Sequence, residues 1–330
     1  RYEVKFKDPQ PNEYTGQTQV RSGATLILGK DGALGSRDSF TSRLALDQNS
    51  NTYLQKHVQS VGSLVIAETA KVNFSDSALV ALSSIDTDYK ANFGTSGGEL
   101  NVVKGGADIR GNLIGNDFSK LSIEEGRASI SSANENFLGT FELRMAEGYL
   151  YNSNALQKAK AVVSQGSSLY FHNAAGLATA RSVDPRSTAN VGAIQNAGQV
   201  FLSGGEDVLE NLNHVNVSDA YAGQKGSVIH YRGLVQGPEN SYVDVVHSAT
   251  ATGTSTVSFG DDHSKIPVSG IFKEARGEKT LKSEGIPIFV IADKGEGENQ
   301  LKLEMQPFGV VAKDDEAYKW IYSLGYKIGR

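Results

Sequence analysis

The sequence predicts an all-β fold in which short strands stack as successive coils of a solenoid. Three observations favour it. The strands are rich in valine, isoleucine, leucine and tyrosine, and glycine, asparagine and serine flank them. A glycine, one or two small or polar residues and an alternating apolar strand recur along the chain. The spacing is irregular, which favours loops inserted at the corners of a solenoid over a propeller or tandem domains. The repeats include Gly23, Gly62, Gly98, Gly126, Gly148, Gly166, Gly198 and Gly226.

A sandwich of antiparallel strands would also give many short strands with turn signals. The parallel coil is favoured because the same order of residues follows each glycine, as stacked equivalent positions require. Residues 154–161 and 206–212 have helical spacing. Each is barely two turns long and therefore too short to be stable without packing. We expect both to be excursions at the corners.

Composition sets the class of protein. A chain of 330 residues is long for one compact domain but ordinary for an elongated repeat protein. The hydrophobic fraction of 39% is enough for a continuous core, and the net charge of -5 gives no electrostatic reason to bind nucleic acid or an anionic membrane. Cysteine is absent, which excludes disulfides, thiolate metal sites and cysteine nucleophiles.

The sequence contains no strong motif for catalysis, metal binding or phosphate binding. Ser96 stands in a Gly-Thr-Ser-Gly-Gly turn, but neither a subtilisin-like nor a chymotrypsin-like pattern surrounds it. The run from Asp261 to His263 is predicted as a polar turn, not a metal site. Residues 105–111 are glycine-rich, yet no lysine-serine ending follows, as a phosphate-binding loop requires. The sequence therefore predicts no catalytic residue, no metal site and no cofactor.

Scattered charges keep one enzymatic alternative open. Parallel β-helices also occur as polysaccharide lyases and hydrolases, which need charged side chains gathered on one outer face. Asp108, Arg110, Glu124 and Arg127 are candidates. Surface charge on a solenoid usually serves solvation, and the sequence does not show which residues share a face.

The C-terminal part carries the most specific pattern. Strand signals occupy residues 223–231, 241–246, 251–257 and 285–291, and an aromatic strand occupies residues 317–324. This order resembles the autochaperone region of monomeric, type Va autotransporter passengers, which are secreted bacterial proteins with a pertactin-like β-helix. The stretch from Tyr14 to Leu28 also has a residue order that is common in these passengers, in which tyrosine, threonine and glycine are followed by glycine, threonine and leucine. The resemblance implies a right-handed parallel β-helix, with a passenger segment in residues 1–222 and the last coils plus an autochaperone-like cap in residues 223–330.

The aromatic strand is the predicted cap. Tyr318, Trp320, Tyr322 and Leu324 alternate and so share one face of a strand. The open end of a solenoid exposes apolar surface and unpaired strand edges, so it needs closure. Since passengers emerge from the outer membrane C-terminus first, the resemblance implies that this capped unit nucleates folding and promotes secretion.

The resemblance also implies function and location. It predicts an extracellular passenger segment at the bacterial cell surface, secreted through the outer membrane by its own β-barrel, which lies outside this chain. The favoured function is non-enzymatic: adhesion or self-association, as in aggregation, biofilm formation and virulence. The expected partners are a host-cell or matrix receptor, like passengers on neighbouring cells, or both, and not nucleic acid. The alternative is the stalk of a secreted autotransporter serine protease whose catalytic domain precedes residue 1.

Overall fold

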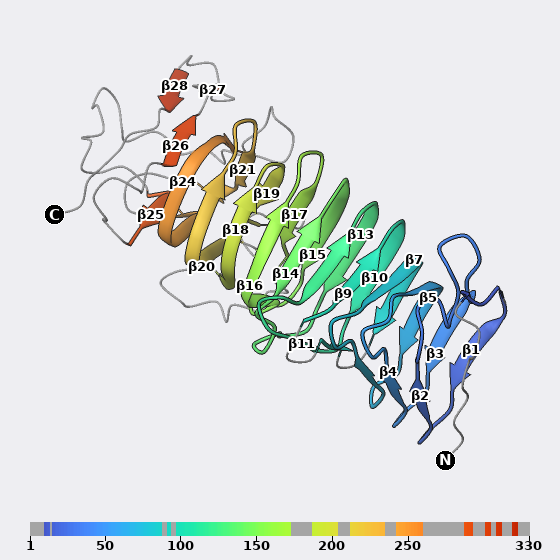
Figure 1. The fold of residues 1–330 in the computed structure, drawn as a ribbon. Coiled ribbons are helices and arrows are strands. Elements are labelled where there is room, and N and C mark those ends of the chain that lie inside the picture. Colours follow the sequence, from blue (N-terminus) through green and yellow to red (C-terminus); the bar gives the residue numbers. More distant parts are fainter. Residues whose placement is uncertain are drawn as a thin grey trace.

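The strands stack along one axis as successive coils of a parallel β-helix (Figure 1). The structure is a computed structural model, and within the residues that it describes every helix or strand element is a β-strand. Neighbouring strands of the stack run parallel, so the predicted all-β parallel β-helix is confirmed. The described residues are 10–13, 15–87, 91–93, 97–172, 187–203, 212–234, 242–259, 287–292, 301–304, 308–311 and 319–322.

Each coil contributes to three faces, which we name A, B and C in their order along the chain. Long strands pass round a corner and contribute to more than one face. Face A contains β9 (Glu99–Val102), β12 (Lys120–Ile123) and β14 (Thr140–Leu143). Strands that it shares with another face are β5 (Gln59–Ile66), β7 (Ala78–Thr87), β16 (Leu156–Val163), β18 (Ser187–Asn196), β20 (Asn213–Gly223) and β24 (Val245–Phe259).

Faces B and C are likewise built from strands of successive coils, some of which they share with another face. Face B also takes the second halves of β5 and β7 and the end of β24. Its own strands are β1 (Gln17–Val20), β3 (Arg43–Leu46), β10 (Gly105–Ile109), β13 (Gly126–Ile130), β15 (Ala146–Leu150), β17 (Ser168–Phe171), β19 (Gln199–Phe201) and β21 (Val228–Tyr231). Face C begins with β2 (Thr25–Ile27), β4 (Asn51–Tyr53), β6 (Lys71–Asn73), β8 (Ala91–Asn92) and β11 (Leu113–Ile114), and ends with β25 (Phe289–Ile291).

The length of a coil explains the irregular repeat. In the middle of the rod, Thr140 pairs with Lys120 on one side and with Lys160 on the other, so these three residues mark successive coils of equal length. Further along, Ser168 pairs with Gln199, and the coil between them is clearly longer. The strands stay in register although the number of residues between them changes. Six of the eight glycines predicted to begin strands lie at or within two residues of a strand start, while Gly62 and Gly148 lie inside β5 and β15.

The core consists of columns of equivalent side chains, one from each coil. Phe74, Phe93 and Phe137 belong to such a column beside face C and are fully buried, and Gly115 occupies the coil between Phe93 and Phe137. The ring centroids of Phe74 and Phe93 are 4.6 Å apart, and those of Phe93 and Phe137 are 5.6 Å apart. Burying a side chain of this size contributes about 1.5–3 kcal/mol. Each coil is therefore stabilised by its immediate neighbours.

Two glycines show why this residue type punctuates the chain. Gly126 begins β13 with a φ of 127°, and a Cβ atom there would lie 1.8 Å from the carbonyl oxygen of Gly105 in the previous coil. Gly148 lies in β15, where a Cβ atom would lie 3.0 Å from the Phe141 ring. Glycine therefore allows an unusual backbone angle at Gly126 and makes space for an aromatic ring at Gly148.

The predicted helical excursion at residues 154–161 is wrong. β16 covers most of this stretch and continues to Val163. Ala159, Ala161 and Val163 are buried, whereas Lys158 and Lys160 are exposed, which is the alternation of a strand. Alanine and lysine favour helices, but pairing with β14 and β18 overrides that preference. The second predicted excursion lies outside the described residues except for Leu212, which is buried.

The parallel coils continue across the predicted boundary at residue 223, because Gly223 of β20 pairs with Gly253 of β24. β26 (Leu301–Glu304) also pairs with β24. Antiparallel pairing occurs between β22 (Gly233–Leu234) and β23 (Tyr242–Val243), and between β27 (Phe308–Val311) and β28 (Lys319–Tyr322). Trp320 and Tyr322 lie in β28, while Tyr318 and Leu324 lie outside the described residues. The cap stays a prediction.

Candidate functional site

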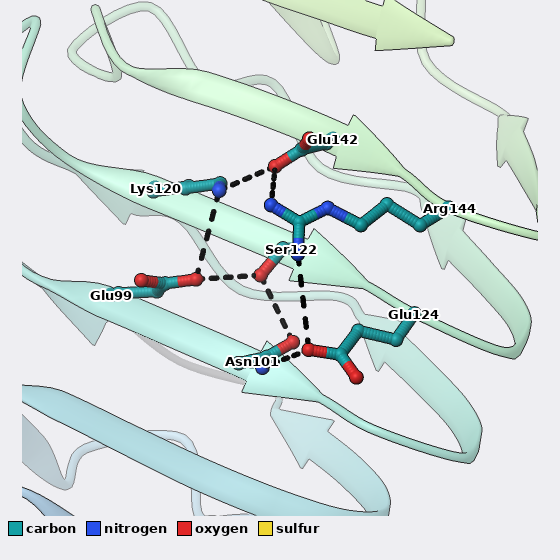
Figure 2. Close-up of polar contacts among 7 residues, drawn as sticks. All are labelled: Glu99, Asn101, Lys120, Ser122, Glu124, Glu142 and Arg144. Atoms are coloured by element: carbon teal, nitrogen blue, oxygen red, sulfur yellow. Dashed lines mark hydrogen bonds and ion pairs between the residues drawn. The ribbon is translucent and has the colours of Figure 1, made fainter. Parts of the chain in front are cut away.

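Face A carries a network of alternating charges on its outer side (Figure 2). In β9, β12 and β14, Leu100, Leu121 and Phe141 point into the core. The side chains on either side of them point outward, because successive residues of a strand face opposite sides of the sheet. Since the three strands are in register, these outward side chains meet across neighbouring coils. The network comprises Glu99, Asn101, Lys120, Ser122, Glu124, Glu142 and Arg144.

Glu142 is the most enclosed acid of the network, with a side chain that is only 15% exposed. Its Oε2 atom lies 2.9 Å from Nη2 of Arg144, and it also pairs with Nζ of Lys120. Lys120 in turn lies 3.8 Å from Oε1 of Glu99. Two cations and two carboxylates thus alternate across the three strands.

Hydrogen bonds join the remaining members. Asn101 donates from Nδ2 to Oε1 of Glu124 over 2.8 Å, and Nη1 of Arg144 lies 3.9 Å from the same oxygen. The hydroxyl oxygen of Ser122 lies 2.9 Å from Oε1 of Glu99 and 3.0 Å from Oδ1 of Asn101. The network therefore crosses three coils without a break.

The charges and hydrogen bonds of the network favour the ionised forms of both Glu142 and Arg144. Burial acts to raise the pKa of Glu142, but hydrogen bonds and positive charge from Arg144 and Lys120 outweigh it, so that the pKa is lowered. The hydrogen bond to Glu142 raises the pKa of Arg144 against the effect of burial. The network thus presents fixed charges in an order set by the strands.

A groove of about 320 Å³ adjoins the network. Ser60, Val80 and Asn101 line it from neighbouring strands of face A, where they are in register. It is also lined by two carboxylates, those of Asp31 and Glu124. Each has its own partner: Oδ1 of Asp31 accepts a 2.8 Å hydrogen bond from the backbone of Val58, and Glu124 accepts the bond from Asn101.

Face B carries a ladder of stacked rings on its outer side. Tyr149, Tyr170, Phe201 and His230 occupy equivalent positions in β15, β17, β19 and β21. Successive ring centroids are 4.5, 4.4 and 4.0 Å apart, with interplanar angles of 5°, 11° and 3°. His230 is only 6% exposed, and its Nε2 atom lies 3.0 Å from Oε1 of Gln199. The ladder links four consecutive coils.

Arg127 lies at one end of this ladder. Its guanidinium carbon is 3.9 Å from the centroid of the Tyr149 ring, and its Nη2 atom donates a 3.3 Å hydrogen bond to the hydroxyl of Tyr151. The ring of His172 lies beside both tyrosines, with centroids 5.7 and 5.5 Å away. Burial and the positive charges of Arg232 and Arg127 lower the pKa of His172. This end of the ladder therefore combines aromatic surface with positive charge.

The four charges considered for a polysaccharide-active enzyme do not form one group. Arg110 pairs with Asp108 and with Asp86 beside face B. Arg127 belongs to the ring ladder of face B, whereas Glu124 belongs to the network of face A. Each of these charges is engaged with a neighbouring side chain.

The other sites weighed from the sequence give no further cluster. Residues 105–109 form strand β10. Ser96 and the run from Asp261 to His263 lie outside the described residues. Within the part of the chain that the structure describes, no group of three or more histidine, aspartate or glutamate side chains is placed to hold a metal ion.

Sequence reasoning missed both the network and the ladder. Each depends on which residues of successive coils are in register, and this follows from the structure. A signal was nevertheless present, because the opposite charges of Glu99 and Lys120 are separated by one coil, and so are the aromatic residues Tyr149 and Tyr170 of the ladder. Opposite charges or aromatic residues that recur at the separation of one coil indicate stacked outward positions.

Comparison of the chain with protein-family models, with curated proteins and with solved structures finds no match. A separate search of the described residues finds no helix with the length and apolar character needed to cross a membrane.

Proposed function

We propose that this protein is an extracellular rod that contributes to bacterial adhesion or self-association, as the passenger segment of a monomeric, type Va autotransporter. The observation that carries the proposal is the ordered outer surface of the coil. On face A a charged network crosses three coils, and on face B a ladder of rings crosses four.

Such a surface suits lateral contacts made of many weak interactions. The outward side chains are held by their neighbours, as Glu142 is by Arg144 and Lys120. Little side-chain freedom is then lost when a second surface approaches, which favours binding. A single contact between exposed charges contributes little, so affinity comes from repetition along the rod.

The C-terminal end supports the proposed secretion role. The coil pairs its strands in parallel, but β27 and β28 pair antiparallel, with Trp320 opposite Val310. An antiparallel pair does not extend the winding of a parallel coil, as expected of a cap that ends it. We include in the proposal that this end nucleates passenger folding.

The test uses bacteria that display the protein and purified protein added as a competitor. We expect the added protein to change the extent of clumping or of attachment to host cells. The double substitution of Lys120 and Arg144 by glutamate reverses two charges of face A and should abolish the effect of the competitor. Lys71→Glu is the matched control, because Lys71 is exposed on face C. If wild-type protein neither inhibits nor promotes clumping or attachment, the proposal fails.

The groove beside face A favours a second candidate, a polysaccharide-active β-helix. Asp31 and Glu124 supply two carboxylates there, and Arg37 also lines the groove. The candidate predicts that the protein releases reducing ends or unsaturated ends from acidic glycans, and that Asp31→Asn and Glu124→Gln abolish the release. Intact glycan chains after prolonged incubation with the wild-type protein would remove this candidate.

A further inference from the structure

The ring ladder of face B begins with a step in the outer surface. Tyr149 lies in β15, and Tyr151 directly follows this strand. In the previous coil the equivalent positions hold the small residues Ser129 and Ser131. The Tyr149 ring stacks on that of Tyr170 in the next coil, and the Tyr151 ring lies within 14° of the plane of Tyr149. Each ring of the step therefore turns one face along the rod, toward the level of the two serines.

One half of this step is filled by the chain itself. The guanidinium carbon of Arg127, in β13, lies 3.9 Å from the centroid of the Tyr149 ring, at the level of Ser129. Only an edge of the group reaches Tyr151, where Nη2 donates to the hydroxyl over 3.3 Å. Among the described residues, the Tyr151 ring contacts Tyr149 beside it and His172 in the next coil. Its other face looks over Ser131, which is exposed.

The space above Ser131 has the height of one ring. Arg110 occupies the equivalent position in the coil before Ser131. Arg110 pairs with Asp86, which lies one coil further back, so its guanidinium group is drawn away from Tyr151. The levels of Arg110 and Tyr151 are two strand spacings apart, or about 9.6 Å. Successive rings of the ladder need only 4.5 Å, so a six-membered ring can enter here and stack on Tyr151.

Within the part of the chain that the structure describes, Arg127 has no acidic partner. Arg110 and Arg144 form ion pairs with neighbouring carboxylates, but Arg127 donates to a phenol. Glu147 is its partner in the strand register, yet this carboxylate accepts a 2.9 Å hydrogen bond from the hydroxyl of Tyr149. A guanidinium group has five N–H donors, so Arg127 keeps donors for a further group while the ring holds it in place.

We propose that the step at Ser131 and Tyr151 binds a carboxylated sugar residue of a glycan. The sugar carboxylate accepts two parallel hydrogen bonds from Arg127, which is the geometry that guanidinium groups favour. The C–H face of the sugar ring packs on Tyr151. Hydroxyl groups of the sugar donate to Glu147 and exchange hydrogen bonds with Ser131. An aromatic surface with a few fixed polar groups around it is typical of a small-molecule site.

Neighbouring charges favour this ligand over other anions. Glu147 lies beside Arg127 in the register, and Asp108 lies one coil back. These carboxylates repel a ligand with many negative charges, such as a polysulfated chain or an acidic peptide. His172 adds no second cation near neutral pH, because burial and nearby arginines lower its pKa. One cation beside hydrogen-bond acceptors matches one carboxylate among hydroxyl groups.

The inference rests on the adhesive role proposed above and names the chemistry of one ligand. The first test titrates the full chain with methyl glucuronide and with methyl sialoside, followed by saturation-transfer NMR. We expect at least one of these sugars to bind with a dissociation constant in the millimolar range. Methyl glucoside lacks the carboxylate and acetate lacks the ring, so each should bind at least tenfold more weakly.

The second test removes the charge. Arg127→Gln should weaken binding of the carboxylated sugar at least tenfold, and Arg127→Lys should weaken it several-fold, because an ammonium group cannot form two parallel bonds. Arg43→Gln is the matched control, since Arg43 is an exposed arginine of β3 on the same face. Its dissociation constant should equal that of the wild type.

The third test fills the step from within the chain. Ser131→Tyr places a ring on Tyr151 where the sugar would stack, so binding should be lost while the free energy of unfolding is not reduced. Tyr151→Ala removes the stacking surface and should weaken binding at least tenfold. Denaturant unfolding of both variants separates loss of the site from loss of the fold.

The outcomes separate this site from the proposed function. The site is overturned if neither carboxylated sugar binds, if methyl glucoside or acetate binds as tightly, or if Arg127→Gln behaves like Arg43→Gln. Binding that survives in Ser131→Tyr also overturns it. In each of these cases the proposed function stands as long as displaying cells clump or attach. If the sugar binds at the step but cells neither clump nor attach, the proposed function fails and the site remains.

Discussion

The side-chain oxygen Oδ1 of Asp244 accepts a 2.7 Å hydrogen bond from the backbone N–H of Asn213 in the previous coil. The same buried carboxyl group accepts a 2.6 Å bond from the backbone N–H of Arg232, and its Oδ2 atom lies 2.8 Å from Oγ of Ser203. One side chain therefore ties three other segments of the chain together. Burial raises the pKa of Asp244 to about 7, although these hydrogen bonds act to lower it.

A buried carboxyl group with a raised pKa should make stability fall as the pH rises. The folded protein keeps the proton of Asp244 up to about pH 7, whereas the unfolded chain loses it near the ordinary value of 3.8. Between these values the unfolded state binds fewer protons, so the free energy of unfolding falls, by on the order of 4 kcal/mol across the interval.

Denaturant unfolding of the wild type and of Asp244→Asn between pH 4 and pH 8 tests this. We expect the free energy of unfolding of the wild type, minus that of the variant, to fall as the pH rises. Asp219→Asn should show no such trend, because Asp219 is exposed. A difference that stays constant with pH contradicts the prediction.

Glu142 should show the opposite dependence. Its pKa is lowered in the folded state, so its contribution is present above the ordinary value of 4.5 and is lost as the pH falls through the folded pKa. Glu142→Gln should reduce the free energy of unfolding at pH 7 by about 0.5–1 kcal/mol. The reduction should disappear in acid, while the exposed control Glu68→Gln should have no effect at either pH. An equal loss at both pH values would show that the ion pairs do not stabilise the fold.

The ring ladder should contribute measurably to stability. Tyr170 stacks on Tyr149 on one side and on Phe201 on the other. Each such pair contributes about 0.5–1.5 kcal/mol beyond area burial, so Tyr170→Ala should cost about 1–3 kcal/mol from stacking alone. Tyr53 is 40% exposed and lies outside the ladder, so Tyr53→Ala should cost less. Equal losses in the two variants, measured by denaturant unfolding, would contradict a stabilising ladder.

Gly126 should not tolerate a side chain. A Cβ atom there meets the carbonyl oxygen of Gly105 at 1.8 Å, and the φ of 127° is strained for any other residue. Gly126→Ala should therefore cost about 3 kcal/mol or more. Gly29→Ala is the control, because nothing lies within 4 Å of a Cβ atom at that position. Equal stability of the two variants in urea would show that adjacent coils can move apart without cost.

Trp320 tests the predicted cap. If the C-terminal unit nucleates folding, Trp320→Ala should slow refolding and reduce display at the cell surface, because later coils form on that unit. Trp320→Phe retains an aromatic ring and should behave nearly as the wild type. Stopped-flow refolding that is unchanged in Trp320→Ala, with only unfolding accelerated, would place the residue outside the nucleus.

The sequence predicted the fold because glycines recur before strands of similar composition. It failed at residues 154–161, where Lys158, Ala159, Lys160 and Ala161 satisfy a helical and a strand pattern equally well. Contacts with the coils on either side decide between the two. Local preference cannot report such contacts, because the residues involved lie a whole coil away along the chain.

The candidate site was less accessible to sequence reasoning. Whether Tyr170 meets Phe201 depends on the length of the intervening coil, and the coil after Tyr170 is longer than the coil before it. A shift of one residue would turn every side chain of a strand to the other face. The charged network of face A and the ring ladder of face B can therefore be derived only once the register of the strands is known.

The constant step from Lys120 to Thr140 to Lys160 has a consequence for how such a molecule can evolve. Duplication or deletion of one segment of that length in this region adds or removes one whole layer and keeps the strands of the remaining coils in register. The span of the rod then changes in increments of about 4.8 Å. Recombination within the gene can therefore change the length of the rod while its coiled architecture is kept.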